Sequence, residues 1–248
     1  MMCGWRFSGL MTVVAALVGL TAITGGALAE TSRMIKFEAY RNGSEFGFST
    51  VKIDGPSGDE RVEVVTALRV GLGPFTAFKY LLRTSTQWRA GQIERLDSVI
   101  NDDGDVFKVK ARRGDGGLAV DGFDGTLTTP ADILPTTYWR ADMVTRSTLL
   151  STQHGRVLKV GFENLGEETV TTEGRRVSAT HHAMRGDLDI DVWHDAKGDW
   201  VKLTFTVGDA DIEYKRVTPS TRDLEAFVAL DTVADVSGAD VHALIELR

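Results

Sequence analysis

The stretch DVWHDAKGDWVKLTF, residues 191–205, predicts two antiparallel strands joined by a tight turn at DAKG. After the turn, Leu203 and Phe205 stand on either side of Thr204, and successive side chains of a strand point to opposite faces. One face of this hairpin is therefore apolar and the other polar, as in a sheet that covers a core on one side. Two tryptophans flank the turn at a spacing that favours a contact across the strands: Trp193 and Trp200.

The same period of two extends outward over most of the chain. It runs through the long segments 62–72 and 75–90, and turns rich in glycine, asparagine and aspartate separate such segments, as in NDDGD at 101–105. Neither a helical heptad nor a regular alternation of strands with helices appears. The sequence therefore predicts a mainly all-β fold, a curved antiparallel sheet or half-barrel of about ten strands, in a single domain over residues 30–218.

One segment, residues 128–155, breaks the period of two and holds two of the five prolines. Pro135 is suited to the first turn of a helix, so a short helical connector is expected near residues 135–146. This connector separates an N-terminal from a C-terminal group of strands. Neither group is long enough to form a stable domain by itself, so we expect both to share one sheet system.

The N-terminal residues 1–29 have the pattern of a secretory signal peptide. A single positive charge precedes an apolar run, which ends in Ala27-Leu28-Ala29. Threonines and glycines interrupt the run, so it is shorter than the about 20 apolar residues that a membrane span needs. An uncleaved N-terminal anchor is the alternative interpretation. Cleavage after Ala29 would place residues 30–248 in the periplasm or outside the cell, with no remaining transmembrane span.

The C-terminal residues 219–248 follow Pro219 and are apolar enough for a helix. Gly238 interrupts the pattern, so the segment is expected to be a helix or a loose tail.

Composition excludes several classes of function. Cys3 is the single cysteine and would leave with the signal peptide, which excludes thiol catalysis, iron–sulfur clusters and thiolate zinc sites in a cysteine-free mature chain. The formal net charge is −7 and no basic patch occurs. Nucleic acids and anionic membrane surfaces are therefore not expected as partners.

No motif in the sequence assigns catalytic residues, a metal or a cofactor. Nucleophile elbows, phosphate-binding loops and zinc-protease motifs do not occur. Adjacent histidines on a strand point to opposite faces, so the best metal cluster would combine only His182 and His194 with a neighbouring aspartate. A non-enzymatic role is favoured. A glycosidase-like carboxylate pair is an open alternative, because the 35 acidic residues offer many pairs, but nothing in the sequence selects one of them.

Several short motifs resemble those of uncharacterised exported proteins of Gram-negative bacteria, which form domain-of-unknown-function families. The motifs are the Trp-x-Asp-x-x-Gly turn at 193–198 followed by WVKLTF and IEYKR, together with LPTTYW at 134–139, LLSTQHG at 149–155 and YRNGSEFGFS at 40–49. The resemblance covers roughly residues 34–217 and leaves the C-terminal tail outside. It implies a curved antiparallel sheet whose half-barrel shape is similar to the periplasmic lipoprotein-carrier fold, and it implies no catalytic residues.

The excess of aromatic and aliphatic residues on single strand faces bears most directly on function. Such a face ordinarily forms core, but a strongly curved sheet closed by the connector would instead line an apolar pocket. The residues expected to line it are Phe46, Phe48, Phe78, Tyr80, Leu82 and Trp88, with Trp139 on the connector as a lid.

The predicted function is therefore that of an exported, non-catalytic protein that binds a lipid or other apolar small molecule in the envelope. One alternative is a protein-interaction or structural module of the envelope, which would present a sheet edge or the C-terminal segment to a protein partner. The other alternative is a hydrolase that acts on an envelope glycan through a carboxylate site.

Overall fold

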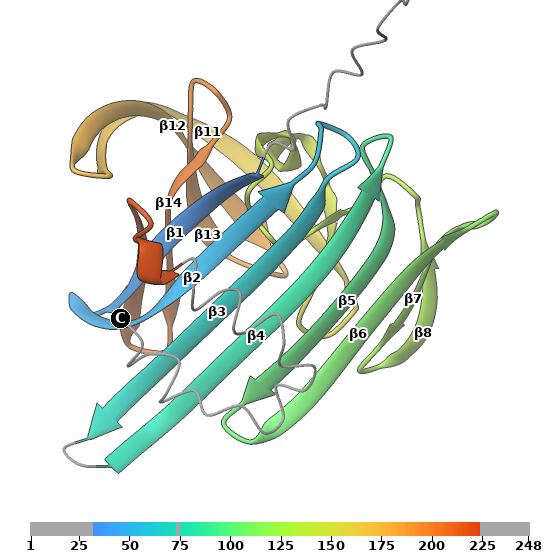
Figure 1. Cartoon of the computed structure of the whole chain (residues 1–248), viewed down its shortest axis with the longest axis horizontal. Helices are drawn as coiled ribbons and strands as arrows, with labels where there is room; N and C mark the ends of the chain where they lie inside the picture. Colours follow the sequence, from blue (N-terminus) through green and yellow to red (C-terminus); the bar gives the residue numbers. More distant parts are fainter. Residues whose placement is uncertain (1–31, 73–74, 224–248) are drawn as a thin grey trace, which may run out of the picture.

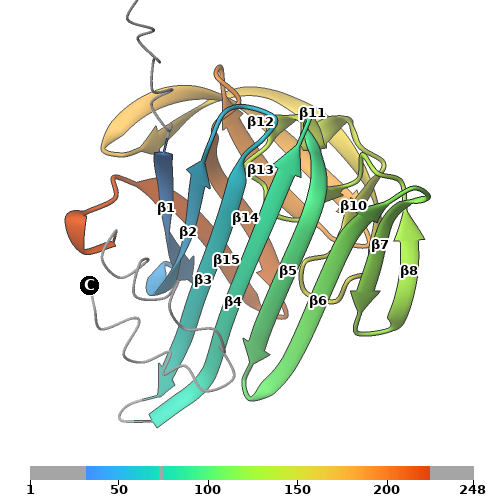
Figure 2. The same cartoon turned by 45° about the vertical axis from the view of Figure 1, so that its right-hand side comes forward.

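The computed structural model describes residues 32–72 and 75–223, which form one large sheet of fifteen strands around an apolar interior (Figure 1). The strand order is β8-β7-β6-β5-β4-β3-β2-β1-β15-β14-β13-β12-β11-β10-β9, so the first and last strands of the domain are neighbours in the middle of the sheet. Neighbouring strands are antiparallel except β9 and β10, which are parallel. The sheet curls strongly without closing on itself, and Figure 2 shows its two halves facing one another.

Eight strands precede the connector, which we define as residues 130–150: β1 (Ser32–Arg41), β2 (Ser44–Asp54), β3 (Arg61–Leu72), β4 (Phe75–Arg89), β5 (Gln92–Asp102), β6 (Asp105–Gly114), β7 (Gly117–Gly122) and β8 (Gly125–Thr129). The connector contains β9 (Leu134–Pro135), the 3-10 helix η1 (Ala141–Thr145) and β10 (Thr148–Leu150). Five strands follow: β11 (Val157–Thr172), β12 (Arg175–Gly186), β13 (Ile190–Asp195), β14 (Trp200–Val207) and β15 (Ala210–Val217).

The predicted all-β class and curved antiparallel sheet are confirmed, whereas the predicted count of about ten strands was too low. The excess comes mainly from short strands. β9 has two residues and β10 has three, which is too few to show a period of two. Both strands form because the connector crosses the sheet edge beside β11, where its backbone groups find partners.

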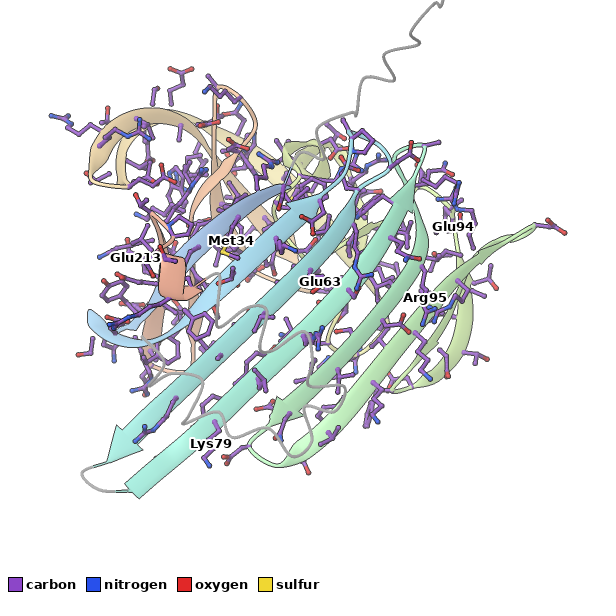
Figure 3. All side chains as sticks on the ribbon, in the orientation of Figure 1. Met34, Glu63, Lys79, Glu94, Arg95 and Glu213 are labelled. Atoms are coloured by element: carbon purple, nitrogen blue, oxygen red, sulfur yellow. The ribbon has the colours of Figure 1, made fainter. Side chains whose placement is uncertain are left out.

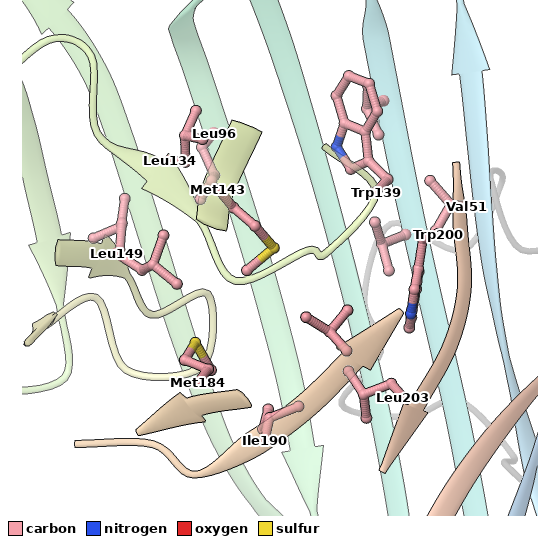
Figure 4. Packing of buried hydrophobic residues seen from close by; sticks show 14 of the residues in the cluster. Val51, Leu96, Leu134, Trp139, Met143, Leu149, Met184, Ile190, Trp200 and Leu203 are labelled. Carbon is pink, nitrogen blue, oxygen red and sulfur yellow. The ribbon is translucent and has the colours of Figure 1, made fainter. Parts of the chain in front are cut away.

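The connector lies inside the space that the curled sheet encloses, which we call the barrel, and fills it. Its apolar side chains pack against the inner faces of strands from both halves of the sheet (Figure 4), and six of them are at most 7% exposed: Ile133, Leu134, Trp139, Met143, Leu149 and Leu150. Burial of such side chains is the main favourable term in folding. The connector is thus part of the hydrophobic core.

Only part of the expected helix near residues 135–146 forms, namely η1. Pro135 belongs instead to β9, and Tyr138 adopts a left-handed backbone conformation with φ of 59°. A residue with this φ cannot continue a right-handed helix. The helix therefore begins only after the chain has turned at Tyr138.

The hairpin at 191–205 forms as β13 and β14, but its two tryptophans do not face each other. A β-bulge shifts the register between Trp193 and His194, so that Trp193 pairs with Lys202 and His194 with Trp200. Trp200 consequently belongs to the inner core cluster, where its ring lies 3.8 Å from that of Phe37. Trp193 lies on the outer face, and the predicted cross-strand contact was wrong.

The outer face of the sheet is rich in charged residues, of which Figure 3 labels Glu63 and Arg95. Arg95 pairs with Asp97 at 2.6 Å, and Glu63 pairs with Arg61 at 2.7 Å. No helix among the described residues is long and apolar enough to cross a membrane. The predicted signal peptide, residues 1–29, and all but the first few residues of the predicted tail lie outside the described residues.

Truncation of Leu149 to alanine should destabilise the protein by about 2–5 kcal/mol, because this connector side chain is fully buried and its removal leaves a cavity. Leu165→Ala is the matched control, since Leu165 is 47% exposed and should cost less than about 0.5 kcal/mol. Urea unfolding followed by tryptophan fluorescence measures both. Equal stability of the two variants would mean that the connector is not part of the core.

Candidate functional site

One end of the barrel gathers six described turns, and we call it the aromatic end. The turns are residues 41–45, 102–105, 122–125, 151–156, 186–190 and 207–211. Backbone hydrogen bonds hold turns together there: the Asn42 amide donates to the Asp211 carbonyl at 2.8 Å, and the Phe123 amide donates to the His154 carbonyl at 2.9 Å. Lys79, labelled in Figure 3, marks this end on β4. The connector's helix η1 lies at the opposite end, which we call the connector end.

Phenylalanines from five strands and one turn lie at the aromatic end. The register places Phe107 on the same face as the core residues Val109 and Ala111, and Phe78 shares its face of β4 with Tyr80. Phe46, Phe162 and Phe205 pack against the core cluster. Because the strands end here, the core side chains do not cover these rings completely. Five are partly buried (Phe46, Phe78, Phe107, Phe162 and Phe205), and Phe123 in the β7–β8 turn is 59% exposed.

Three of the rings at this end pack against one another. The centroids of Phe107 and Phe123 lie 5.0 Å apart in an edge-to-face arrangement, and the His154 ring lies 5.6 Å from Phe107. The loop that carries His154 approaches β7 so closely that a Cβ on Gly122 would lie 2.5 Å from the His154 carbonyl oxygen. A glycine at this position is therefore what allows the loop to rest on the sheet.

Behind the phenylalanines, Tyr80 points inward from β4 and packs against the core. Its hydroxyl accepts a hydrogen bond from Gln153 Nε2 at 2.9 Å. Burial raises the pKa of Tyr80, and it also raises the pKa values of Tyr138 and Tyr214, so all three phenols are neutral at physiological pH. These three buried phenols therefore add no charge to the interior.

The turns of the aromatic end are strongly acidic. They carry only two basic side chains, Arg41 and Arg156, against nine carboxylates: Glu45, Asp102, Asp103, Asp105, Asp124, Asp187, Asp189, Asp209 and Asp211. Partial burial raises the pKa of Asp102, and the neighbouring Asp103 and Asp105 raise it further. Turns at the connector end carry both signs, with Arg61, Arg89, Arg113, Arg175 and Lys197 beside Asp54, Asp59, Asp115, Glu173 and Asp195.

A groove of about 650 Å³ lies near the aromatic end, between the β12–β13 turn and the β14–β15 hairpin. Most of its lining comes from the outer face of the sheet, where Lys202 pairs with Trp193, and Thr204 pairs with Asp191 and Glu213. Its apolar lining comes from Ile190, Phe205 and Ile212, and its charged lining comes from Arg185, Lys202 and the carboxylates Asp189, Asp191, Asp211 and Glu213. Pockets of this size hold small ligands or a few side chains. The groove therefore places the inward-facing Phe205 and Ile212 beside charged side chains of the outer face, among which carboxylates outnumber basic groups.

The structure brings some of the seven sequence-predicted pocket residues together and separates others. Phe46, Phe78 and Tyr80 lie at the aromatic end, and Leu82 lies one step further along the inner face of β4. Phe48 lies on the opposite face of the sheet, because it pairs with Ala67 while Leu82 pairs with Thr66. Trp88 and Trp139 lie at the connector end, where their ring centroids are 5.9 Å apart and both are buried.

Four phenylalanines of the aromatic end were not among those predicted residues: Phe107, Phe123, Phe162 and Phe205. A signal for three of them exists in the sequence, since each stands near a turn on the apolar face of its strand, as in VFKVKA and WVKLTF. The rings come together at one end because of the order of the strands in the sheet, and the sequence of a single strand does not reveal that order.

Two histidines point into the barrel from neighbouring strands. The register pairs His182 with Val192, a core residue, and His194 is 3% exposed on the same face. His194 Nε2 lies 3.0 Å from the Tyr138 carbonyl oxygen, which can only accept, so Nε2 carries the proton and Nδ1 is bare. Nδ1 is buried and has no hydrogen-bond partner among the described residues. Burial lowers the pKa of His194, and His182 lowers it further, against the raising effects of the Tyr138 carbonyl, Asp195 and Asp199.

His181 on the outer face belongs to a separate polar cluster. Its Nδ1 lies 2.8 Å from Glu168 Oε1, its Nε2 lies 3.7 Å from Asp191 Oδ2, and its ring stacks on Trp193. Asp191 is also paired with Arg185 at 2.8 Å. The cluster ties β11, β12 and β13 together. Over the whole described part of the chain, no three His, Cys, Asp or Glu side chains converge as metal ligands.

Comparisons with known proteins give a family and a fold but no activity. The family model DUF6134, described as a domain of unknown function, matches residues 37–217. Seven chains of solved structures match, among them the crystal structure of a β-barrel-like protein of domain of unknown function DUF1849 from Brucella abortus. That chain is 14% identical with a TM-score of 0.54, and the match covers 75% of this chain and 95% of that one, which shows the fold alone. No curated protein matches.

Acid should weaken the fold through His194. Its pKa in the folded protein lies below the ordinary value of 6.5, so the unfolded chain binds the proton more readily. The contribution of neutral His194 to stability is complete above about pH 6.5 and is lost as the pH falls toward the lowered folded pKa. The free energy of unfolding between pH 7.5 and 5 should therefore decrease less in His194→Gln, which keeps a donor for the Tyr138 carbonyl.

Urea unfolding at each pH measures this difference. His154→Gln, at a partly exposed ring of the aromatic end, is the matched control. If His194→Gln and wild type lost stability in parallel over this range, His194 would not be responsible for the acid sensitivity.

Proposed function

We propose that this chain, which belongs to the DUF6134 family of domains of unknown function, is a non-catalytic binding protein whose aromatic end takes an apolar or amphipathic ligand. The observation that carries the proposal is the group of incompletely covered phenylalanines at that end, with Phe123 59% exposed. Exposed apolar groups that cluster at one place mark binding surfaces more often than isolated ones do. The adjoining groove supplies a concave surface beside Phe205.

The filled interior determines where such a ligand would bind. Leu149, Leu150 and Met143 are at most 2% exposed, and Trp139 packs against Trp88, so entry of a ligand into the centre would require displacement of the connector. Close-packed cores resist such displacement. Phe46 and Phe78 therefore belong to the proposed binding surface, whereas Tyr80, Leu82, Trp88 and Trp139 support it from within.

The proposed compartment is the cell envelope, and the support for it is the signal-like pattern of residues 1–29. A hydrolase is less well supported, because the polar cluster around His181 has its side chains engaged with one another and lies on the outer face.

The neutral fluorophore N-phenyl-1-naphthylamine should bind with enhanced fluorescence, and Phe123→Ser should weaken its affinity about tenfold, through loss of a contact of roughly 1.4 kcal/mol. Leu165→Ser is the matched control, since Leu165 is also an exposed apolar side chain but lies on β11 away from the aromatic end. A fluorescence titration measures both. Equal affinities in the two variants, or no uptake by wild type, would contradict the proposal.

Export should remove the first 29 residues. Protein recovered from a periplasmic extract should have the mass of residues 30–248, because small side chains at Ala27 and Ala29 fit a signal peptidase. Ala29→Phe should prevent cleavage, and Ala16→Phe within the apolar run serves as the control. Full-length protein in the cytoplasm would contradict the proposed compartment.

A further inference from the structure

We propose that the occupant of the aromatic end is a polypeptide segment in which apolar side chains alternate with lysine or arginine: the apolar side chains rest on the phenylalanines, and a basic side chain enters the groove between Asp189 and Asp211. This inference rests on the proposed function and names the partner of the same site. Three observations carry it, namely the depth of the apolar surface, the charge of the turns around it and the lining of the groove.

The apolar surface is too shallow for a long acyl chain. The rings at the aromatic end stand directly over the core, whose members Leu149, Leu150 and Met184 are at most 1% exposed. A long chain would need a deep apolar cavity to be buried along its length. Short side chains of a polypeptide can be covered by the phenylalanine rings without any opening of the interior.

The surrounding charge favours a cationic partner. Nine carboxylates stand against two arginines in the described turns of this end, and one of those arginines, Arg156, is already paired with Asp124 at 3.1 Å. A surface of one sign attracts the opposite sign and repels its own over about 8 Å at physiological ionic strength. The same carboxylates would repel an anionic lipid head group.

The groove supplies particular carboxylates for a basic side chain. Of its four acidic residues, Asp191 pairs with Arg185, and Glu213 pairs with Lys202 at 3.4 Å. Asp189 and Asp211 form no ion pair with any residue between 32 and 223 that the structure describes. Because Phe205 and Ile212 line the same groove, a lysine or arginine can bury its aliphatic stem there while its charge meets a carboxylate.

The test is isothermal titration of the protein with three short peptides in which leucine alternates with lysine, glutamine or glutamate. We expect the lysine peptide to bind most tightly and the glutamate peptide least, with the preference shrinking as salt is added. The double variant Asp189→Asn, Asp211→Asn should weaken binding of the lysine peptide about tenfold and leave the glutamine peptide nearly unchanged.

Asparagine preserves local structure in these variants, since Asp189 Oδ1 accepts the Gly186 amide at 3.0 Å and an amide oxygen can do the same. The matched control is Asp59→Asn, Asp115→Asn at the connector end, where Asp59 Oδ1 accepts the Ala90 amide at 3.0 Å. This control should bind the lysine peptide as wild type does.

The outcomes separate the inference from the proposed function. Equal affinity for the lysine and glutamate peptides, or an unchanged affinity in the groove variant, would overturn the inference and leave the apolar binding surface standing. Uptake of decyltrimethylammonium without uptake of any peptide would also overturn it, in favour of a small cationic amphiphile. Failure to bind the peptides, the amphiphile and the neutral fluorophore would overturn both proposals.

Discussion

The structure depends on one constraint, which is that a sheet this large must bury its inner face although it does not close. The connector meets this constraint by lying inside the curl, where Trp139, Met143 and Leu149 contact strands of both halves. An empty interior of these dimensions would leave dozens of apolar groups without partners and would be unstable. The polar anchors of the connector, including His194 on the Tyr138 carbonyl and Arg140 on the Gly91 carbonyl, fix its path.

The position of the connector makes the two ends of the barrel different. At the connector end, the chain covers the strand termini, and Arg140 lies 4.8 Å over the Trp88 ring. At the aromatic end, short turns and one loop are all that follow the strands within residues 32–72 and 75–223, and phenylalanines there are partly uncovered among acidic residues. The same segment that supplies the core thus covers one end of the barrel and leaves partly exposed phenylalanines at the other.

The sequence was sufficient for the fold class and insufficient for the site. Alternation predicts each long strand because residues two apart share a face, and the resemblance to a domain-of-unknown-function family is confirmed. Alternation fails at bulges, as at Trp193 and His194, where one extra residue exchanges the faces of everything beyond it. Phe48 and Leu82 were predicted to line the same pocket for a related reason. Alternation shows which residues of one strand share a face, but it does not show which of the two faces points inward. The meeting of Phe107, Phe123 and Phe205 depends on strand order, which arises from contacts between distant segments.

That strand order also has a kinetic consequence. The sheet is joined in its middle by β1 and β15, with Lys36 opposite Val217, so its central pair connects the two ends of the domain. Contacts between residues far apart in sequence slow folding, because the chain must lose much entropy before they form. During synthesis, the first eight strands can assemble as successive hairpins, but β1 keeps an open hydrogen-bonding edge until β15 has emerged. The domain is therefore most exposed to mispairing with other chains just before its last strand is made.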